Sequence, residues 1–407
     1  MAGPAAEPKS NSPWSKSPVP FTKLEILKSS SHSVGDALRD LDKRALLSGD
    51  FVLVYGDVVS NISLDAALAA HRARRSTEKD AIMTMVLREA GEGPHRSRAH
   101  DYAPTFVIDP KAQRCLHYEQ VRKTSSRRSV GGRRGLTRDN EDGHEHGSVP
   151  YVTIDAEILT QNAHLEIRQD LIDCGIDICT PDALALWSDN FDYEAPRRGF
   201  LHSVLKDYEL NGKTIHVHIL KDGQRNSSGG GIYAARARSL AAYDALSRDV
   251  IGRWAYPMCP DSNLKRDQSY VLRKRNVYEE KGVMLSRSCV LEQATVVGMD
   301  TVIGDGSIVT HSVIGRGANI GKNVILDGAY IWDYAVIGDG SVIRSAIVAD
   351  EAAIGKSCRL EPGALVSFGV VVPNGTVVKG SSRLSKSRDE GTYSIGYTNI
   401  YADTLFK

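Results

Sequence analysis

Aliphatic residues in the C-terminal part of the chain recur at an interval that fits neither a helix nor a simple strand. Their positions advance by six, six and five residues and then repeat, at 297, 303, 309, 314, 320, 326, 331, 337, 343, 348, 354 and 360. The step stays at six through Val366, Val372 and Val378, and Leu285 and Leu291 extend the series upstream. Such steps exclude the helical period of about 3.6 and the alternation of a single strand.

The hexapeptide VIGDGS begins at residue 302 and again at 336, and looser copies begin at 319 and 353. This repeat predicts a parallel β-helix, in which three six-residue pieces close one triangular coil and one aliphatic side chain per piece points inside. A single coil buries too little to stand alone, so we expect about five stacked coils over residues 283–380. Gly304, Gly321, Gly338 and Gly355 would lie at corners, where a positive φ or a close backbone approach requires glycine.

The N-terminal part alternates helical and strand patterns, which predicts an α/β domain of the doubly wound kind over residues 21–257. Ser33 is a plausible N-cap of the first helix. The run FVLVYGD is apolar along its strand, as in a strand buried in a parallel sheet. The expected helices are 33–46, 63–76, about 197–206 and 236–254, and the expected strands are 51–57, 81–89 and 214–220.

Several segments lack the apolar residues needed to offset the entropy of ordering. We expect a disordered arm over 1–20, a disordered insert over 122–150, a linker over 258–282 and a polar tail over 381–407. The sequence of the insert leaves two alternatives to a disordered loop open. Its arginines at 127, 128, 133 and 134 could contact nucleic acid, although no aromatic residues interleave them. Its histidines at 144 and 146 could bind zinc, although no cysteine lies nearby.

Composition narrows the class of protein. The chain has 407 residues, of which 41% are hydrophobic and 25% charged, and its net charge is +1. This balance gives no reason to expect a nucleic acid or an acidic membrane as partner. No apolar run reaches the roughly 18 residues of a membrane-spanning helix. The six cysteines form no CxxC pair, so we expect buried free thiols and a reducing, cytosolic setting.

Asp57 ends the sequence VYGD and is a candidate metal ligand. A carboxylate just past a parallel strand lies where such sheets bind ligands, and in a nucleotidyltransferase it would hold Mg²⁺. The alternative is a turn that Asp57 merely caps. The first 50 residues contain only Gly3, Gly35 and Gly49 and no glycine cluster to cradle a triphosphate. We therefore predict that Asp57 is a vestigial metal position.

Hexapeptide β-helices occur in acyltransferases, at the tails of sugar-nucleotide pyrophosphorylases and in their non-enzymatic relatives. An acyltransferase needs a histidine in a cleft between coils, and His311 in IVTHSV is the candidate within the repeats. No carboxylate pattern accompanies it, so a solvated corner is the preferred interpretation.

Three segments carry a resemblance to a known family. They are SVGDALRDLDKRALLSGDFVLVYGDVVSNISLDAALAAHRARR from residue 33, DLIDCGIDICTPDALALWSDNFDY at 170–193 and DVIGRWAYPMCPDSN at 249–263. Together with the repeats, they resemble the epsilon subunit of eukaryotic translation initiation factor 2B over roughly residues 20–380. The resemblance implies a nucleotidyltransferase-like domain followed by a left-handed β-helix, without a cofactor. It also implies a cytosolic, multisubunit guanine-nucleotide exchange factor that acts on the initiation factor 2 GTPase, with the gamma subunit among the partners.

The Asn-Phe-Asp motif of this family is implicated in exchange and corresponds to Asn190, Phe191 and Asp192. The residues alone leave two interpretations open: Phe191 is an exposed anchor of an interface, or it is core and Asn190 caps a turn. The family's C-terminal catalytic helical domain and its first strand find no match, so we expect a chain truncated at both ends that assembles and engages the GTPase without nucleotidyltransferase activity. The alternative function is a sugar-nucleotide pyrophosphorylase of the mannose-1-phosphate guanylyltransferase type.

Overall fold

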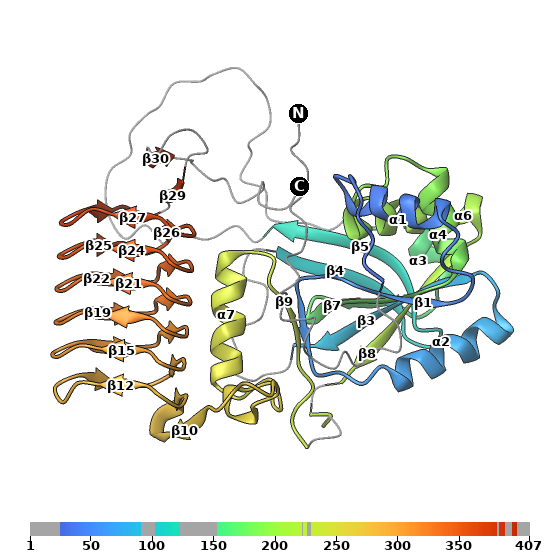
Figure 1. Cartoon of the computed structure of the whole chain (residues 1–407). Coiled ribbons are helices and arrows are strands. Elements are labelled where there is room, and N and C mark those ends of the chain that lie inside the picture. Colours follow the sequence, from blue (N-terminus) through green and yellow to red (C-terminus); the bar gives the residue numbers. More distant parts are fainter. Residues whose placement is uncertain are drawn as a thin grey trace, which may run out of the picture.

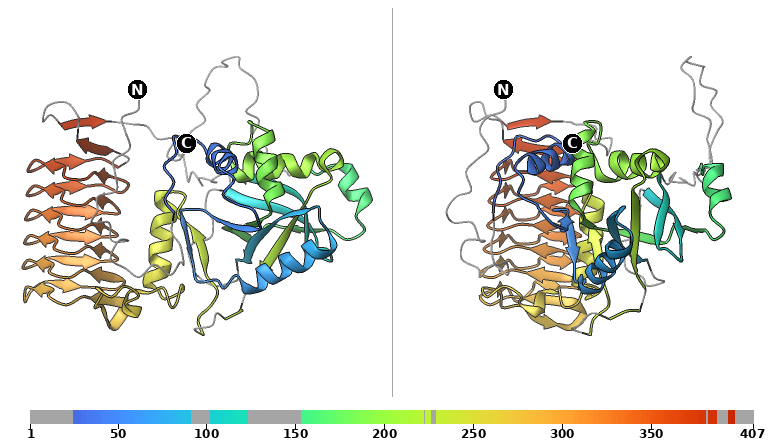
Figure 2. Two further views of the ribbon diagram at one scale, coloured as in Figure 1. Left: turned by 45° about the vertical axis from the view of Figure 1, so that its right-hand side comes forward. Right: turned by 90° about the vertical axis from the view of Figure 1, so that its right-hand side faces the viewer.

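The computed structural model describes residues 25–90, 102–122, 153–221, 223–225, 229–380, 382–386 and 393–396. The expected arm 1–20, the expected insert beyond residue 122 and the larger part of the expected tail lie outside these residues. The described part of the tail is not merely polar chain, because Arg383–Lys386 and Tyr393–Gly396 form strands. An α/β domain and a three-faced β-solenoid lie side by side, and a single helix, α7 (Leu240–Ile251), lies between them (Figure 1). The left-hand view of Figure 2 shows the same arrangement from another side.

A seven-stranded sheet forms the centre of the α/β domain. Strands β3 and β8 are parallel and occupy its middle, and the other neighbouring strands pair antiparallel. The expected α/β class is confirmed, but the parallel character is limited to this central pair. In spatial order the strands are β1 (Phe51–Val54), β7 (Leu171–Cys179), β3 (Ala81–Glu89), β8 (Thr214–Leu220), β5 (Arg114–Arg122), β4 (Tyr102–Asp109) and β6 (Glu166–Arg168).

Strand β1 corrects one expectation, because it is an edge strand of the described sheet and is not buried on both faces. Val52 and Val54 keep 36% and 53% of their surface exposed, whereas Phe51 and Leu53 pack against the core. Its only partner in that sheet is β7, which runs antiparallel to it. An unbroken apolar run therefore does not show that both faces are covered.

Helices cover both faces of the sheet. On one face, α1 (Val34–Lys43), α4 (Pro181–Asp189), a π-helical turn (Pro196–Leu201) and α5 (His202–Lys206) share one core with β3, β5 and β8. On the other face, α2 (Asp65–Thr77) and β9 (Ala234–Arg236) pack through Ala67 and Ala234. The remaining elements are β2 (Val58–Ser60), which pairs with β9, and the short helices α3 (Ala156–Gln161) and α6 (Tyr208–Asn211).

The helix termini follow the sequence signals. Ser33 caps α1 as predicted, and its hydroxyl accepts a hydrogen bond from the Asp36 amide at 3.0 Å. Helix α7 is shorter than the predicted 236–254, because Arg236 belongs to β9 and the hydroxyl of Ser239 caps the helix by accepting from the Ala242 amide at 3.1 Å. The strands predicted at 81–89 and 214–220 are confirmed to the residue.

The solenoid has the predicted three faces. The twelve inward positions from Val297 to Leu360 are all at most 2% exposed and form one continuous core. Its second face consists of β12 (Met284–Leu285), β15 (Val302–Ile303), β18 (Asn319–Ile320), β21 (Val336–Ile337), β24 (Ala353–Ile354) and β27 (Val371–Val372). Its third face consists of β13 (Val290–Leu291), β16 (Ile308–Thr310), β19 (Ile325–Asp327), β22 (Val342–Arg344), β25 (Arg359–Leu360) and β28 (Val377–Val378).

The first face of the solenoid is longer than the other two. Strand β11 lies in the range 258–282 that the sequence predicts to be a linker, and it pairs with β14 as a further strand of this face. With six strands on each of the other faces, the stack has one coil more than expected. The first face consists of β10 (Val271–Arg273), β11 (Val277–Glu279), β14 (Thr295–Val297), β17 (Val313–Ile314), β20 (Tyr330–Ile331), β23 (Ile347–Val348), β26 (Leu365–Val366), β29 (Arg383–Lys386) and β30 (Tyr393–Gly396).

The repeated glycines are required by the close approach of successive coils. A Cβ atom on Gly304 would lie 2.6 Å from the carbonyl oxygen of Gly321, and one on Gly338 would lie 2.6 Å from the carbonyl carbon of Gly355. Of the two reasons expected for glycine, a positive φ applies to other corner residues, such as Gly306 and Gly340. The stacking distance of the coils therefore fixes the first glycine of each VIGDGS copy.

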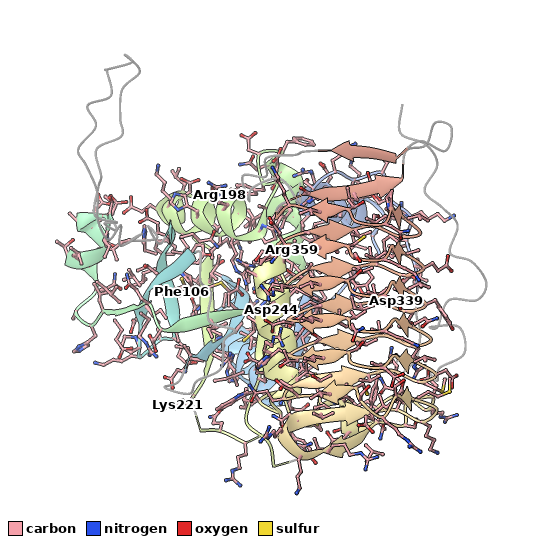
Figure 3. The ribbon with its side chains drawn as sticks, turned by 90° about the vertical axis from the view of Figure 1, so that its left-hand side faces the viewer. Phe106, Arg198, Lys221, Asp244, Asp339 and Arg359 are labelled. Carbon is pink, nitrogen blue, oxygen red and sulfur yellow. The ribbon has the colours of Figure 1, made fainter. Side chains whose placement is uncertain are left out.

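Helix α7 joins the two domains through polar and apolar contacts. The Tyr330 hydroxyl donates to the Asp244 carboxylate at 2.6 Å, and the Tyr278 hydroxyl donates to the Ile251 carbonyl at 2.8 Å. Arg248 donates to the carbonyl of His311 at a corner of the solenoid. Figure 3 shows Asp244 on α7 next to the solenoid strands. Among the described helices, none combines the length and the hydropathy that crossing a bilayer requires.

Candidate functional site

Asn190, Phe191 and Asp192 form a turn directly after α4. The side-chain oxygen of Asn190 accepts a hydrogen bond from the Asp192 amide at 2.9 Å, which closes the turn. Phe191 projects outward and keeps 72% of its surface exposed. The alternative that Phe191 belongs to the core is therefore wrong, whereas the capping role of Asn190 is present. The part of these residues in exchange stays a prediction.

An aromatic cluster holds the chain on both sides of Phe191. Trp187 on α4 stacks on Phe200 with ring centroids 4.6 Å apart, and Tyr193 meets both rings edge-on. All three side chains are buried. The exposed phenylalanine therefore projects from a turn whose two ends are anchored in the core.

Arg39 and Gly35 of α1 also position this turn, and sequence reasoning missed both. The buried guanidinium of Arg39 donates to the carbonyl of Trp187 at 3.2 Å and to that of Asn190 at 3.1 Å. Its carbon atom Cζ lies 5.3 Å from the centroid of the Phe191 ring, within the range of a cation–π contact. The contact spans about 150 positions of the sequence, so no local pattern could indicate it.

Gly35 lets the first turn of α1 approach the segment that follows Asp192. Its amide donates to the Glu194 carbonyl at 3.0 Å, and a Cβ atom at this position would lie 1.8 Å from the Tyr193 carbonyl oxygen. A glycine inside a helix pattern, where alanine would be favoured, was the one available signal of this close approach.

We expect Gly35→Ala to destabilise the α/β domain by about 1–3 kcal/mol, because the methyl group forces α1 away from the turn. The free energy of unfolding, from denaturant titration, measures the effect. Gly49→Ala is the matched control, since a Cβ atom there has no neighbour within 4 Å among the described atoms. Equal stability of the two variants would contradict the close packing of α1 on the turn.

Asp57 belongs to a second cluster of polar residues, beside strand β7. Both carboxylate oxygens of Asp57 are bonded by Arg236, at 2.9 and 3.0 Å. Arg197 bridges Asp173 and Asp177 with four hydrogen bonds of 2.7 to 3.0 Å. We call the whole cluster the ionic network; its members are Tyr55, Asp57, Asp173, Asp177, Arg197, Arg236 and Arg238.

Burial and the arginine charges shift the pKa values of the carboxyl groups in this network in opposite directions. Burial alone would raise the pKa of Asp173, but the guanidiniums of Arg197, Arg238 and Arg236 outweigh it and hold the pKa below its ordinary value. For Asp177, which is fully buried, desolvation prevails and raises the pKa, and the neighbouring Asp173 charge acts in the same direction. Three arginines thus balance three carboxylates at the position where the sequence predicts a vestigial metal ligand.

The residues around Asp57 do not suit a metal ion. A divalent cation needs free carboxylate oxygens, and those of Asp57 are held in a fork by a permanently charged guanidinium. In the described part of the chain, no three His, Cys, Asp or Glu side chains are grouped as a metal site would require. Nor does Asp57 simply cap a turn, since its carboxylate is paired with Arg236, 179 positions away.

His311 lies at a solenoid corner, as expected, with a positive φ of 49°. Its ring nitrogen Nε2 is 3.0 Å from Nε2 of Gln293, and its Nδ1 is 3.9 Å from the Asp327 carboxylate on the next coil. The side chain of His311 is 39% exposed, in agreement with a solvated corner, and the Asp327 carboxylate near it follows no local pattern in the sequence. The repeat places Asp327 beside Thr310 in the neighbouring strand, which a linear motif does not show.

All six cysteines are free thiols, as predicted, and five of them are buried. Burial raises the pKa of the Cys115 thiol to about 12. The Cys115 thiol is therefore a poor nucleophile near neutral pH.

The fold defines the class of protein: an α/β domain followed by a left-handed β-helix of hexapeptide repeats. Residues 274–378 match the family model described as the EIF2B subunit epsilon LbH domain. The chain is homologous to the epsilon subunits of translation initiation factor eIF2B, so the resemblance drawn from the sequence is confirmed.

Two curated relatives carry this name. The protein of Schizosaccharomyces pombe is 42% identical over 393 residues, which cover 96% of this chain and 53% of that protein. The protein of Dictyostelium discoideum is 34% identical over 262 residues, which cover 64% of this chain and 32% of that protein. The chain thus spans about half the length of the first relative and about a third of the second.

Proposed function

We propose that this chain is the assembling and GTPase-engaging part of an eIF2B-type guanine-nucleotide exchange complex in the cytosol. It supports GDP/GTP exchange on initiation factor 2 through protein surfaces, alongside the gamma subunit and the other subunits. The homology to eIF2B epsilon subunits supports this proposal. The observation that carries the engaging surface is the exposure of Phe191 on a turn anchored by Arg39, because a rigid, exposed aromatic side chain is typical of an interface hot spot.

We also propose that the α/β domain does not transfer nucleotides, and the ionic network supports this second part of the proposal. Arg236 occupies both oxygens of Asp57, the carboxylate that a pyrophosphorylase would need for Mg²⁺. Incubation of the full chain with Mg²⁺, pyrophosphate and GDP-mannose should release no GTP. Turnover that disappears in Asp57→Asn would contradict this half and favour the pyrophosphorylase alternative.

The interface is tested with Phe191→Ala, alone and together with Asn190→Ala. We expect Phe191→Ala to weaken binding of purified initiation factor 2 at least tenfold, as for a hot-spot residue. The loss of unfolding free energy should stay below about 1 kcal/mol, because the side chain is exposed. Surface plasmon resonance and denaturant titration measure the two quantities.

Phe368→Ala is the matched control, since Phe368 is also an exposed phenylalanine, at 59%, and lies on the solenoid. It should bind initiation factor 2 as the unchanged chain does. Recovery of the gamma subunit should be equal for all variants. Unchanged binding of initiation factor 2 by Phe191→Ala would overturn the proposal for this turn.

A further inference from the structure

A hollow beside Phe191 combines an exposed aromatic ring with an excess of positive charge. It is lined by the segment before α1, by the outer side of α1 and by Phe191 itself. Four permanent cations line it, Lys28, Arg39, Lys43 and Arg44, together with His32. We call it the basic hollow.

Two of the four cations are already paired and two are available. Arg39 bonds Asp36 at 2.8 Å, and Arg44 bonds Asp40 at 2.9 Å, so these pairs are locally neutral. Lys28 and Lys43 are exposed, and neither forms an ion pair with a described residue. The hollow therefore presents a net charge of about +2 within the reach of one short segment.

Ser29, Ser30 and Ser31 also line the hollow, and the hydroxyl groups of Ser29 and Ser31 are hydrogen-bonded to each other. Hydroxyl groups can donate hydrogen bonds to carboxylate oxygens, and the ammonium groups of lysines attract carboxylates electrostatically. The Phe191 ring, with the Arg39 guanidinium at 5.3 Å, offers an apolar anchor next to these polar groups. An apolar centre with a charged rim is the usual arrangement of a protein interface.

We infer that the basic hollow receives an acidic segment of the protein that the Asn190–Asp192 turn engages. This inference rests on the proposed function and adds to it the chemistry of the partner. A short acidic peptide fits better than a nucleic acid. The two exposed lysines would neutralise few phosphates, and Phe191 is the one Phe, Tyr or Trp among the described residues that line the hollow, so a nucleic acid would find few backbone or stacking contacts there.

The two parts of the surface should affect different rate constants. Charges at the rim of an interface act mainly on the association rate and its salt dependence, whereas a desolvated anchor acts on the dissociation rate. We therefore expect Lys28→Glu/Lys43→Glu to lower the association rate constant for initiation factor 2 roughly tenfold at 50 mM salt. The deficit should shrink to less than about twofold at 500 mM salt.

Lys111→Glu/Lys206→Glu is the matched control, since it reverses the same number of exposed lysines away from the hollow. Phe191→Ala should raise the dissociation rate and leave the salt dependence unchanged. If Phe191→Ala weakens binding but the Lys28/Lys43 variant behaves as the control does, the inference fails and the proposed function stands. If Phe191→Ala has no effect on binding, the proposed function fails at this turn, and the inference fails with it.

Two probes separate the classes of ligand. A labelled sixteen-residue polyglutamate peptide should bind the full chain, be displaced by initiation factor 2 and lose binding in the Lys28/Lys43 variant. A sixteen-nucleotide uridine RNA should not bind in a way that these lysines control. RNA binding that the Lys28/Lys43 variant abolishes, with no binding of the peptide, would overturn the inference in favour of a nucleic acid.

Discussion

Ile337→Asp is expected to lower the unfolding free energy of the solenoid by at least about 3–5 kcal/mol and to leave little soluble chain. Ile337 is 1% exposed and lies in the middle of the continuous solenoid core, with Ile320 and Ile354 as its strand neighbours. An aspartate there loses the apolar contacts of isoleucine and buries a carboxyl group without a partner. Each coil is stable only through its neighbours, so damage in a central coil affects the whole stack.

The adjacent residue provides the control. Val336 belongs to the same strand, points to the opposite side and is 44% exposed. Val336→Asp should change the unfolding free energy by no more than about 0.5 kcal/mol. Circular dichroism during urea titration compares the two variants on the isolated full chain. Equal transition midpoints would show that the inward side of the coil is assigned incorrectly.

Arg197→Met should be the most damaging change in the α/β domain, at about 3–5 kcal/mol of unfolding free energy. It removes four hydrogen bonds and leaves Asp177, which is fully buried, as an uncompensated charge. Removing one partner of a buried ion pair costs far more free energy than the intact pair contributes, because the remaining charge is buried without a counter-charge or hydrating water. Arg198→Met is the control, since Arg198 is the next residue of the same π-helical turn and is exposed (Figure 3).

The deficit of Arg197→Met should depend on pH. Without Arg197, burial raises the pKa of Asp177 further above its unfolded value. A carboxyl group with a raised folded pKa loses stability as pH rises from its unfolded pKa to its folded pKa, because the unfolded state releases the proton first. The deficit relative to the unchanged chain should therefore be larger at pH 8 than at pH 5. A deficit that is the same at both values would mean that the network is stabilised by packing rather than by charge.

The elements that sequence alone predicted are those whose evidence is local. The six-six-five spacing places one side chain per strand, and all the central inward positions are buried accordingly. Ser33 caps α1 because a cap depends on residues three positions apart. The pattern of β3 predicts its bounds because seven consecutive apolar or β-forming residues are followed by the charged Arg88 and Glu89.

The rest depends on contacts between residues far apart in the chain. The Asp57–Arg236 pair and the Arg39–Asn190 bond join segments that a linear pattern does not relate. Strand β1 has the composition of a central strand, and only its position at the edge of the described sheet determines that Val52 and Val54 are exposed. The motif at 190–192 was recognised through its family, whereas the residues that hold it were recognised through geometry alone.

The corners at which the inward positions advance by five residues instead of six restrict where α7 can pack on the solenoid. The five-residue step occurs in three consecutive coils, at His311, Gly328 and Ser345, and each of these residues has a positive φ. Arg248 donates to the carbonyl at the first short corner, and a Cβ atom on Gly328 at the second would lie 3.5 Å from its guanidinium. A stack of identical coils would suffer from translational ambiguity, because a helix could slip by one coil and meet the same surface again. Longer corners above and below limit such slippage, and the hydrogen bonds of Tyr330 to Asp244 and of Tyr278 to Ile251 hold the α/β domain at a single height along the solenoid axis.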